Sequence, residues 1–149
     1  FYLAGLIDTL VIIAPFRVHR QWISKQLPRW ADFEWNGFVY PGNEKMKTQK
    51  WRRLFDEALE IREVKPALRV FAFHFEAMRL TRYDPRKPRR LPAPIKALDR
   101  IYDTTRKGVM CVVDEMHRAK DLTAQQTRGI LRYGKGRSKV RRAAGRPRS

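Results

Sequence analysis

The chain has 149 residues, a length that suits one domain or one lobe of a larger protein, and its 43% hydrophobic and 11% aromatic content excludes disorder over the whole length. Its 33 Lys and Arg against 15 Asp and Glu give a formal net charge of +18, which excludes an ordinary neutral surface and favours a polyanionic partner, nucleic acid ahead of an anionic membrane. A single cysteine excludes a disulfide framework and a Cys-based zinc site, and the absence of an 18-residue apolar run excludes a transmembrane helix, so we expect no membrane partner.

The first part of the chain predicts one strand and two amphipathic helices. Leu10–Ala14 is apolar, largely β-branched and stopped by Pro15, which is typical of a strand buried on both faces. A helix is predicted next and is expected to end at Pro28. Residues 32–43 are expected to form an irregular or short extended link, and a second helix is predicted over 51–59. The apolar stripe of the first helix contains Val18, Trp22, Ile23 and Leu27.

The second part of the chain predicts two strands and two further helices. Residues 68–75 form a short β-like run, and residues 79–90 are expected to be a solvated basic loop. A helical stripe at 95–101 follows two prolines that suit a helix start. The apolar run at 108–115 predicts a strand that ends at two acidic residues, and a last helix is predicted over 123–133.

Apolar strands that alternate with amphipathic helices predict an α/β fold, a parallel sheet flanked by helices. In such sheets ligands bind at the carboxyl ends of the strands. Cys111 is expected to be an inert core thiol in the middle of its strand. For the tryptophans of the helical stripes, core packing is favoured over base stacking; these are Trp22, Trp30 and Trp51.

The acidic pair at the end of the last strand carries the strongest chemical signal. Asp114 at such a position can hold Mg²⁺ through water, and Glu115 can orient or deprotonate an attacking water. The alternative is that the pair only caps the next helix. The longer string Asp-Glu-x-His, residues 114–117, favours the catalytic interpretation.

Three segments together resemble a known family. The string VVDEMHRAKDLTAQQTRGILRYGK, residues 112–135, resembles motif II of superfamily-two DEAD/DEAH-type helicases, in particular the Swi/Snf-like ATPase branch. VIIAPFRVHRQWISKQLPRW is similar to motif Ia, and VFAFHFEAMR is similar to motif Ib, in the order of the family. The resemblance implies a RecA-like first lobe of an ATP-driven motor on nucleic acid.

The resemblance also implies roles for individual residues. Asp114 would hold Mg²⁺, Glu115 would be the catalytic base, and His117 would couple the nucleotide site to motif III or to a second lobe. Motifs Ia and Ib would lie along the backbone of a nucleic acid, with Pro15, Arg17, His19, Arg20, His74 and Glu76 as candidate contacts. For the basic residues of motif Ia the alternative is a solvated helix face, and for His74 it is an ordinary loop histidine.

The implied cofactors are ATP and Mg²⁺, and the implied partners are nucleic acid, with DNA favoured, and a second RecA-like lobe of the same parent chain. The implied location is intracellular, either cytoplasmic or nucleoid-associated. The family's phosphate loop, G-x-x-x-x-G-K-[ST], does not occur in these 149 residues, and the glycines of GKGRSK at 134–139 lack its spacing. We expect that loop upstream of Phe1, and we expect the chain alone to bind ATP poorly.

Residues 1–134 are therefore expected to be a partial helicase ATP-binding domain. Residues 135–149 are expected to be a basic tail, whose end RRAAGRPRS resembles a degenerate motif III. Two alternatives remain open. One is a non-catalytic basic module that binds nucleic acid, and the other is the motor subunit of a restriction system.

Overall fold

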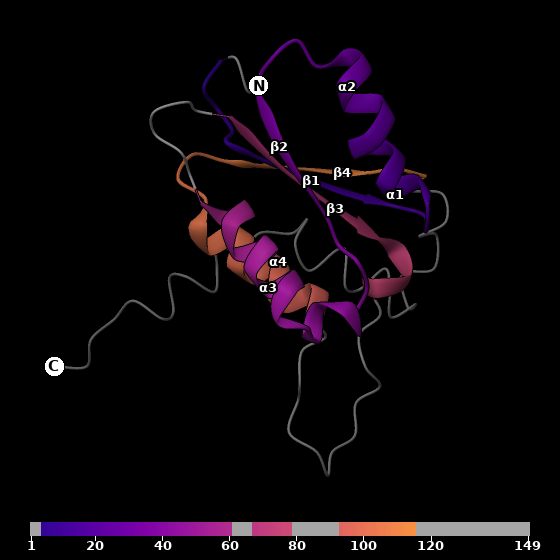
Figure 1. The fold of residues 1–149 in the computed structure, drawn as a ribbon. Coiled ribbons are helices and arrows are strands. Elements are labelled where there is room, and N and C mark those ends of the chain that lie inside the picture. The colour runs from indigo at the N-terminus through magenta and orange to yellow at the C-terminus, as the bar shows by residue number, and fades with distance from the viewer. Residues whose placement is uncertain (1–3, 61–66, 79–92, 116–149) are drawn as a thin grey trace, which may run out of the picture.

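The chain forms a four-stranded sheet in which every strand pair is parallel, with helices on both faces (Figure 1). The computed structural model describes residues 4–60, 67–78 and 93–115. The strands are β1 (Thr9–Ala14), β2 (Trp35–Val39), β3 (Leu68–His74) and β4 (Val109–Val113), in the sheet order β2-β3-β1-β4. This arrangement confirms the expected α/β fold and is consistent with a RecA-like lobe.

The register of β1 sets the geometry of the sheet edge. β1 lies between β3 and β4, with Ala14 opposite His74 and Ile13 opposite Val113. Because the three strands are parallel and in step, their carboxyl ends meet at one edge. The sequence-based expectation that these strands lie together in the sheet is therefore confirmed.

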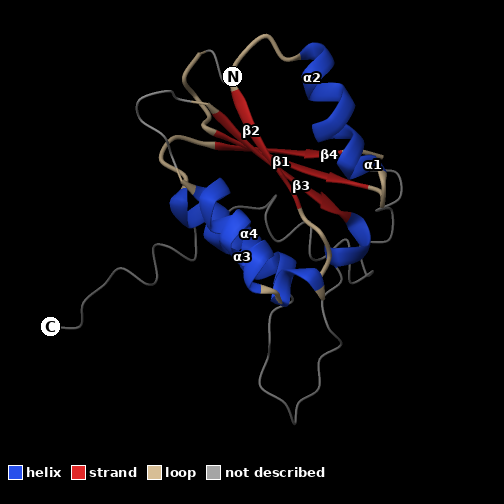
Figure 2. Cartoon of the chain, in the orientation of Figure 1, coloured by secondary structure: helices blue, strands red, loops and turns tan. Residues whose placement is uncertain are grey.

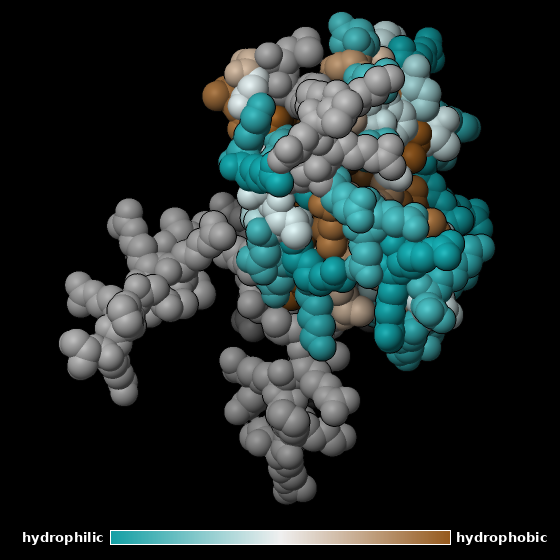
Figure 3. Space-filling view, turned by 60° about the vertical axis from the view of Figure 1, so that its left-hand side comes forward, coloured by the Kyte–Doolittle hydropathy of each residue, from teal (hydrophilic) through white to brown (hydrophobic). Residues whose placement is uncertain are grey.

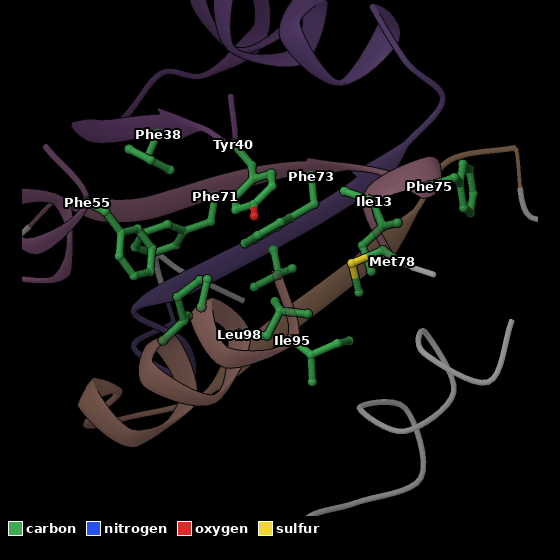
Figure 4. Close-up of a cluster of buried hydrophobic side chains, with 14 of the residues drawn as sticks. Ile13, Phe38, Tyr40, Phe55, Phe71, Phe73, Phe75, Met78, Ile95 and Leu98 are labelled. Atoms are coloured by element: carbon green, nitrogen blue, oxygen red, sulfur yellow. The ribbon is translucent and has the colours of Figure 1, made fainter. Parts of the chain in front are cut away.

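Alternate residues of β1 and β3 pack on opposite faces of the sheet, as the pleat of a strand requires. One face is covered by α3 (Gln49–Leu59) and α4 (Ala93–Thr104), as Figure 2 shows. Figure 4 shows part of this hydrophobic cluster, in which Phe71 and Phe73 from β3 lie near Leu98 from α4. Both expected helical stripes, at 51–59 and 95–101, are thus confirmed.

The other face is covered by one helical segment built from α1 (Val18–Gln21), the π-helical η1 (Trp22–Gln26) and α2 (Leu27–Trp30). Its predicted stripe packs against Ile12 and Ala72. The expected end of this helix at Pro28 is wrong, since the helix continues to Trp30. The π-helical turn shifts the hydrogen bonds, and Pro28 stands in the first turn of α2, where proline is tolerated.

Residues expected to form an irregular or short extended link include a regular strand. β2 pairs with β3 from Trp35 to Val39 and forms one edge of the described sheet. Short 3-10 turns follow β2 and β3, namely η2 (Lys45–Lys47) and η3 (Phe75–Met78).

Two expected core residues are exposed. Trp30 is 70% exposed at the end of α2, and the guanidinium of Arg29 lies 4.9 Å from the centre of its ring. Cys111 is exposed on β4, an edge strand of the described sheet, although the protein around the thiol still desolvates it and raises its pKa to about 11. Patches of hydrophobic side chains also interrupt the hydrophilic surface in Figure 3.

The opposite, amino-terminal edge of the sheet holds a buried charge that the sequence analysis did not identify. Arg69 on β3 is 3% exposed, and its guanidinium donates hydrogen bonds to the Leu59 carbonyl and to threonine hydroxyls. The Asp8 carboxylate lies 3.9 Å away. This network joins β1, β3, α3 and α4 at the edge remote from the acidic pair.

Several expectations fall outside the described residues. These are the basic loop at 79–90, the helix at 123–133, His117 and the boundary between the two expected regions at 134 and 135. Within the described ranges, no helix has the length and apolar character needed to cross a membrane.

Candidate functional site at the carboxyl edge of the sheet

The candidate site lies where β1, β3 and β4 end together. Pro15 follows β1, His74 is the last residue of β3, and Asp114 follows β4. The backbone N–H of Asp114 donates to the carbonyl oxygen of Ile13 over 2.8 Å, which continues the pairing of β4 with β1. The backbone of Asp114 is therefore fixed at the carboxyl edge of the sheet. In parallel sheets this is the edge where ligands bind.

The carboxylate of Asp114 is half-buried and has a partner from the helical segment α1–η1–α2. The indole Nε1–H of Trp22 donates to its Oδ2 over 2.9 Å, across 92 positions of sequence. Sequence reasoning assigned Trp22 to core packing, and it does pack against the sheet. Sequence reasoning missed the contact with Asp114. Helical periodicity shows which face of a helix carries Trp22, but it does not show which polar atom the indole ring contacts.

Glu115 is exposed and has a backbone φ of 54°, in the left-handed region that non-glycine residues rarely adopt. The chain therefore turns sharply directly after the strand. Such backbone conformations concentrate at ligand and active sites. Glu115 therefore stands at the surface of this sheet edge.

The loop between β1 and α1 presents basic and aromatic groups to solvent. Arg17 has φ 74° and ψ −41°, a strained conformation at the start of α1. Phe16 is 51% exposed, and the guanidinium carbon of Arg20 lies 6.0 Å from the centre of its ring. Arg17 and Arg20 are both exposed and available to a polyanion, whereas Pro15 is buried.

His19 lies elsewhere than the sequence analysis expected. It is fully buried, so its ring cannot contact a nucleic-acid backbone in this conformation. Its ring centre lies 5.1 Å from that of His74, and His74 Nδ1 lies 3.2 Å from a carboxylate oxygen of the exposed Glu76. Desolvation, reinforced by the nearby His74, lowers the pKa of His19 to about 4. His19 therefore packs beneath the loop between β1 and α1. His74 is half-buried, and Glu76 is exposed.

The residues present fit Mg²⁺ better than they fit a complete nucleotide site. Within the described ranges, no group of three or more His, Cys, Asp or Glu side chains is arranged to hold a metal. Mg²⁺ needs no such group when one carboxylate, water and nucleotide phosphates complete its shell. Asp114 has one oxygen bound by Trp22, and its second oxygen accepts no hydrogen bond from the other described residues. The cradle for the phosphates, by contrast, has no counterpart in the sequence.

Comparison with known proteins adds no match of any kind. No protein-family model, no curated protein and no solved structure matches the chain. The resemblance to helicases therefore depends on the order and spacing of the three motifs alone.

Proposed function

We propose that the chain is a fragment of the first RecA-like lobe of a superfamily-two, Swi/Snf-like motor, which couples ATP hydrolysis to movement along nucleic acid, with DNA favoured. The observation that carries the proposal is the meeting of three strand ends. The acidic pair after β4 lies at the same edge as the residues that end β1 and β3, in the register given by Ala14 with His74 and Ile13 with Val113. The three segments that resemble motifs II, Ia and Ib thereby share one edge.

The chemistry proposed for the acidic pair follows from the half-buried position of Asp114 and the exposure of Glu115. Asp114 would hold Mg²⁺ through water at its second carboxylate oxygen, and the ion would supply charge neutralisation at the nucleotide phosphates. Glu115, accessible at the turn after β4, would accept a proton from the attacking water. Phosphoryl transfer depends mainly on such positioning and on charge neutralisation.

The basic surface supports a polyanionic track. The net charge of +18 favours a nucleic acid, and Arg17 and Arg20 are exposed beside the strand ends. The location proposed for the parent protein is the compartment that holds its DNA, cytoplasmic or nucleoid-associated.

The test is the DNA-stimulated ATPase activity of the longest natural polypeptide that contains these residues. We expect Glu115→Gln to abolish turnover and to leave nucleotide binding largely intact, because this side chain acts on water rather than on the phosphates. Glu57→Gln, on the exposed face of α3, is the matched control and should keep full turnover. Unchanged turnover in Glu115→Gln would contradict the assignment.

A second candidate function is a non-catalytic basic module that binds nucleic acid on a motor-like fold. The observation that favours it is the formal net charge of +18, which supports binding of nucleic acid without any catalytic step. The two candidates differ upstream of the Phe1 codon. An in-frame G-x-G-K-T there favours the motor, and a start codon directly before Phe1 favours the binding module.

A further inference from the structure

We infer that Trp22 is a positioning residue for Asp114, and that its indole N–H holds one carboxylate oxygen so that the other faces the metal. The inference rests on the proposed function, since it concerns the metal-binding carboxylate of that same site. It adds a residue to the site that lies in motif Ia rather than in motif II.

The hydrogen bond has the features of a positioning contact. The donor is neutral, the acceptor is a carboxylate, the distance is 2.9 Å, and both side chains are half-buried. Hydrogen bonds to ionised acceptors are stronger than neutral ones, and partial burial strengthens them further. Since the backbone N–H of Asp114 is bound to Ile13, the residue is held at its backbone and at one of its two carboxylate oxygens.

The local backbone of Trp22 departs from a regular α-helix at this residue. η1 begins at Trp22, and the Trp22 carbonyl accepts a hydrogen bond from the N–H of Leu27, five residues later. π-helical turns inside α-helices occur frequently at functional sites. The irregular turn therefore begins at the residue whose side chain reaches the acidic pair.

The contact also joins two expected binding surfaces. The helical segment that carries Trp22 begins beside the exposed Arg17 and Arg20, which are the expected nucleic-acid contacts. A cation that draws the carboxylate of Asp114 towards itself changes the hydrogen bond to Trp22. Binding of a metal at Asp114 would then alter a contact made by the helical segment that follows β1.

The competing explanation is that the carboxylate merely satisfies a half-buried indole N–H, as most buried tryptophans require. A bond of that kind is present with or without a metal. The response of the Trp22 indole to a divalent cation therefore separates the two explanations.

The experiment uses the full 149-residue chain with ¹⁵N-labelled tryptophan, and records the four indole N–H resonances. Trp22→Phe assigns the Trp22 resonance. We expect Asp114→Asn to shift this resonance and to leave that of Trp51, on the other face of the sheet, unchanged. With excess ATP present to supply the phosphate ligands, Mg²⁺ should shift the Trp22 resonance, and Mn²⁺, which prefers the same oxygen ligands, should broaden it selectively. Asp114→Asn should remove both responses, and Asp56→Asn on α3 should keep them.

Affinity for Mn²⁺, measured with the same excess of ATP, provides the second readout. Loss of a group that orients a metal ligand typically weakens binding by at least about tenfold, so we expect about that loss in Trp22→Phe and none in Trp51→Phe. If Trp22→Phe fails to fold, the responses of the Trp22 resonance in the wild-type chain and in Asp114→Asn still decide the question.

Two results would overturn the inference. One is a Trp22 resonance that ignores Asp114→Asn, which removes the contact itself. The other is a Trp22 resonance that shifts in Asp114→Asn but does not change with Mg²⁺ or Mn²⁺. That result would mean that the hydrogen bond has a structural role alone. Failure of the proposed function gives a different result. In that case Glu115→Gln leaves ATP turnover unchanged, and this outcome does not depend on the Trp22 resonance.

Discussion

The imidazole rings of His19 and His74 lie 5.1 Å apart at the carboxyl ends of β1 and β3, and His19 is fully buried. Among the described residues, neither ring nitrogen of His19 has a hydrogen-bond partner. Burial first, then His74 and Arg20, lower the pKa of His19, whereas the Pro15 carbonyl and Glu76 act in the opposite direction. The net result is a pKa of about 4 against a usual value of 6.5, so His19 is neutral at pH 7.

This depressed pKa predicts a loss of stability in mild acid. Between pH 6.5 and about 4 the unfolded chain binds a proton at His19 that the folded chain does not, so the free energy of unfolding falls as the pH falls. Above pH 6.5 the neutral His19 does not lower the free energy of unfolding. Near pH 4 that free energy is lower by about 3 kcal/mol, at roughly 1.4 kcal/mol per pKa unit.

Urea denaturation of the wild-type chain and of His19→Phe across this pH range measures the effect. Carboxylates titrate in both proteins, so the difference between them isolates His19. We expect the wild type to lose more stability than the variant between pH 6.5 and pH 4. A difference that stays constant over this range would contradict the assignment of the shift to His19.

The sequence predicted β1, β3 and the helical stripes because their hydrophobic pattern reflects burial directly, and it predicted β4 from its apolar run although Met110 and Cys111 of that strand are exposed. β2 escaped prediction because its exposed Asn36 and Gly37 break the apolar run, and the strand is defined by its pairing with β3. The edge shared by Asp114 and His74 followed from the parallel topology. The burial of His19 and the contact of Trp22 with Asp114 could not be predicted in this way. Both depend on the backbone conformation of the loop after β1 and of the π-helical turn η1, which set the directions of these side chains.

Arg69 is predicted to be the most costly charged residue to remove from the amino-terminal edge. Its guanidinium donates to the Leu59 carbonyl at 2.7 Å and to the Thr9 hydroxyl at 2.6 Å, and it is 3% exposed. Arg69→Met leaves these acceptors without their donor and should lower the free energy of unfolding by about 3 kcal/mol. Arg69→Lys should restore only part of this, because an ammonium cannot reproduce the planar fork.

Urea denaturation at pH 7 measures both Arg69 variants. Arg53→Met is the matched control, since Arg53 is exposed on α3 and, among the described residues, forms an ion pair with Glu57 alone, at 3.4 Å. A change below about 1 kcal/mol in Arg69→Met would show that the network is dispensable.

Gly108 is predicted to be required where β4 begins. A Cβ at this position would lie 2.6 Å from the backbone carbonyl oxygen of Leu6, and a backbone atom cannot move aside as a flexible side chain can. The Gly108 carbonyl also accepts the N–H of Asp8 over 3.2 Å. Gly108→Ala should therefore cost about 1–3 kcal/mol of stability, as overpacking does elsewhere. Thermal denaturation measures the cost, and Lys107→Ala at the exposed neighbouring position should have little effect; equal melting of the two variants would contradict the clash.

The salt dependence of DNA binding tests whether Arg17 and Arg20 contact phosphates. Each phosphate neutralised on duplex DNA contributes a slope of about −0.9 to the plot of log affinity against log salt concentration. If both side chains bind phosphates, Arg17→Gln with Arg20→Gln should make the slope shallower by about 1.8 and should weaken binding equally on unrelated sequences.

The matched control for this measurement is Arg52→Gln with Arg53→Gln, which removes the same charge from exposed positions of α3 on the opposite face of the sheet. Both double variants lower the net charge from +18 to about +16, so long-range attraction changes equally in the two. A larger slope change in the motif Ia variant therefore reports direct contact at the strand ends. Equal changes in the two variants would instead mean that the chain attracts DNA through its overall charge, and that the loop after β1 is not a binding surface.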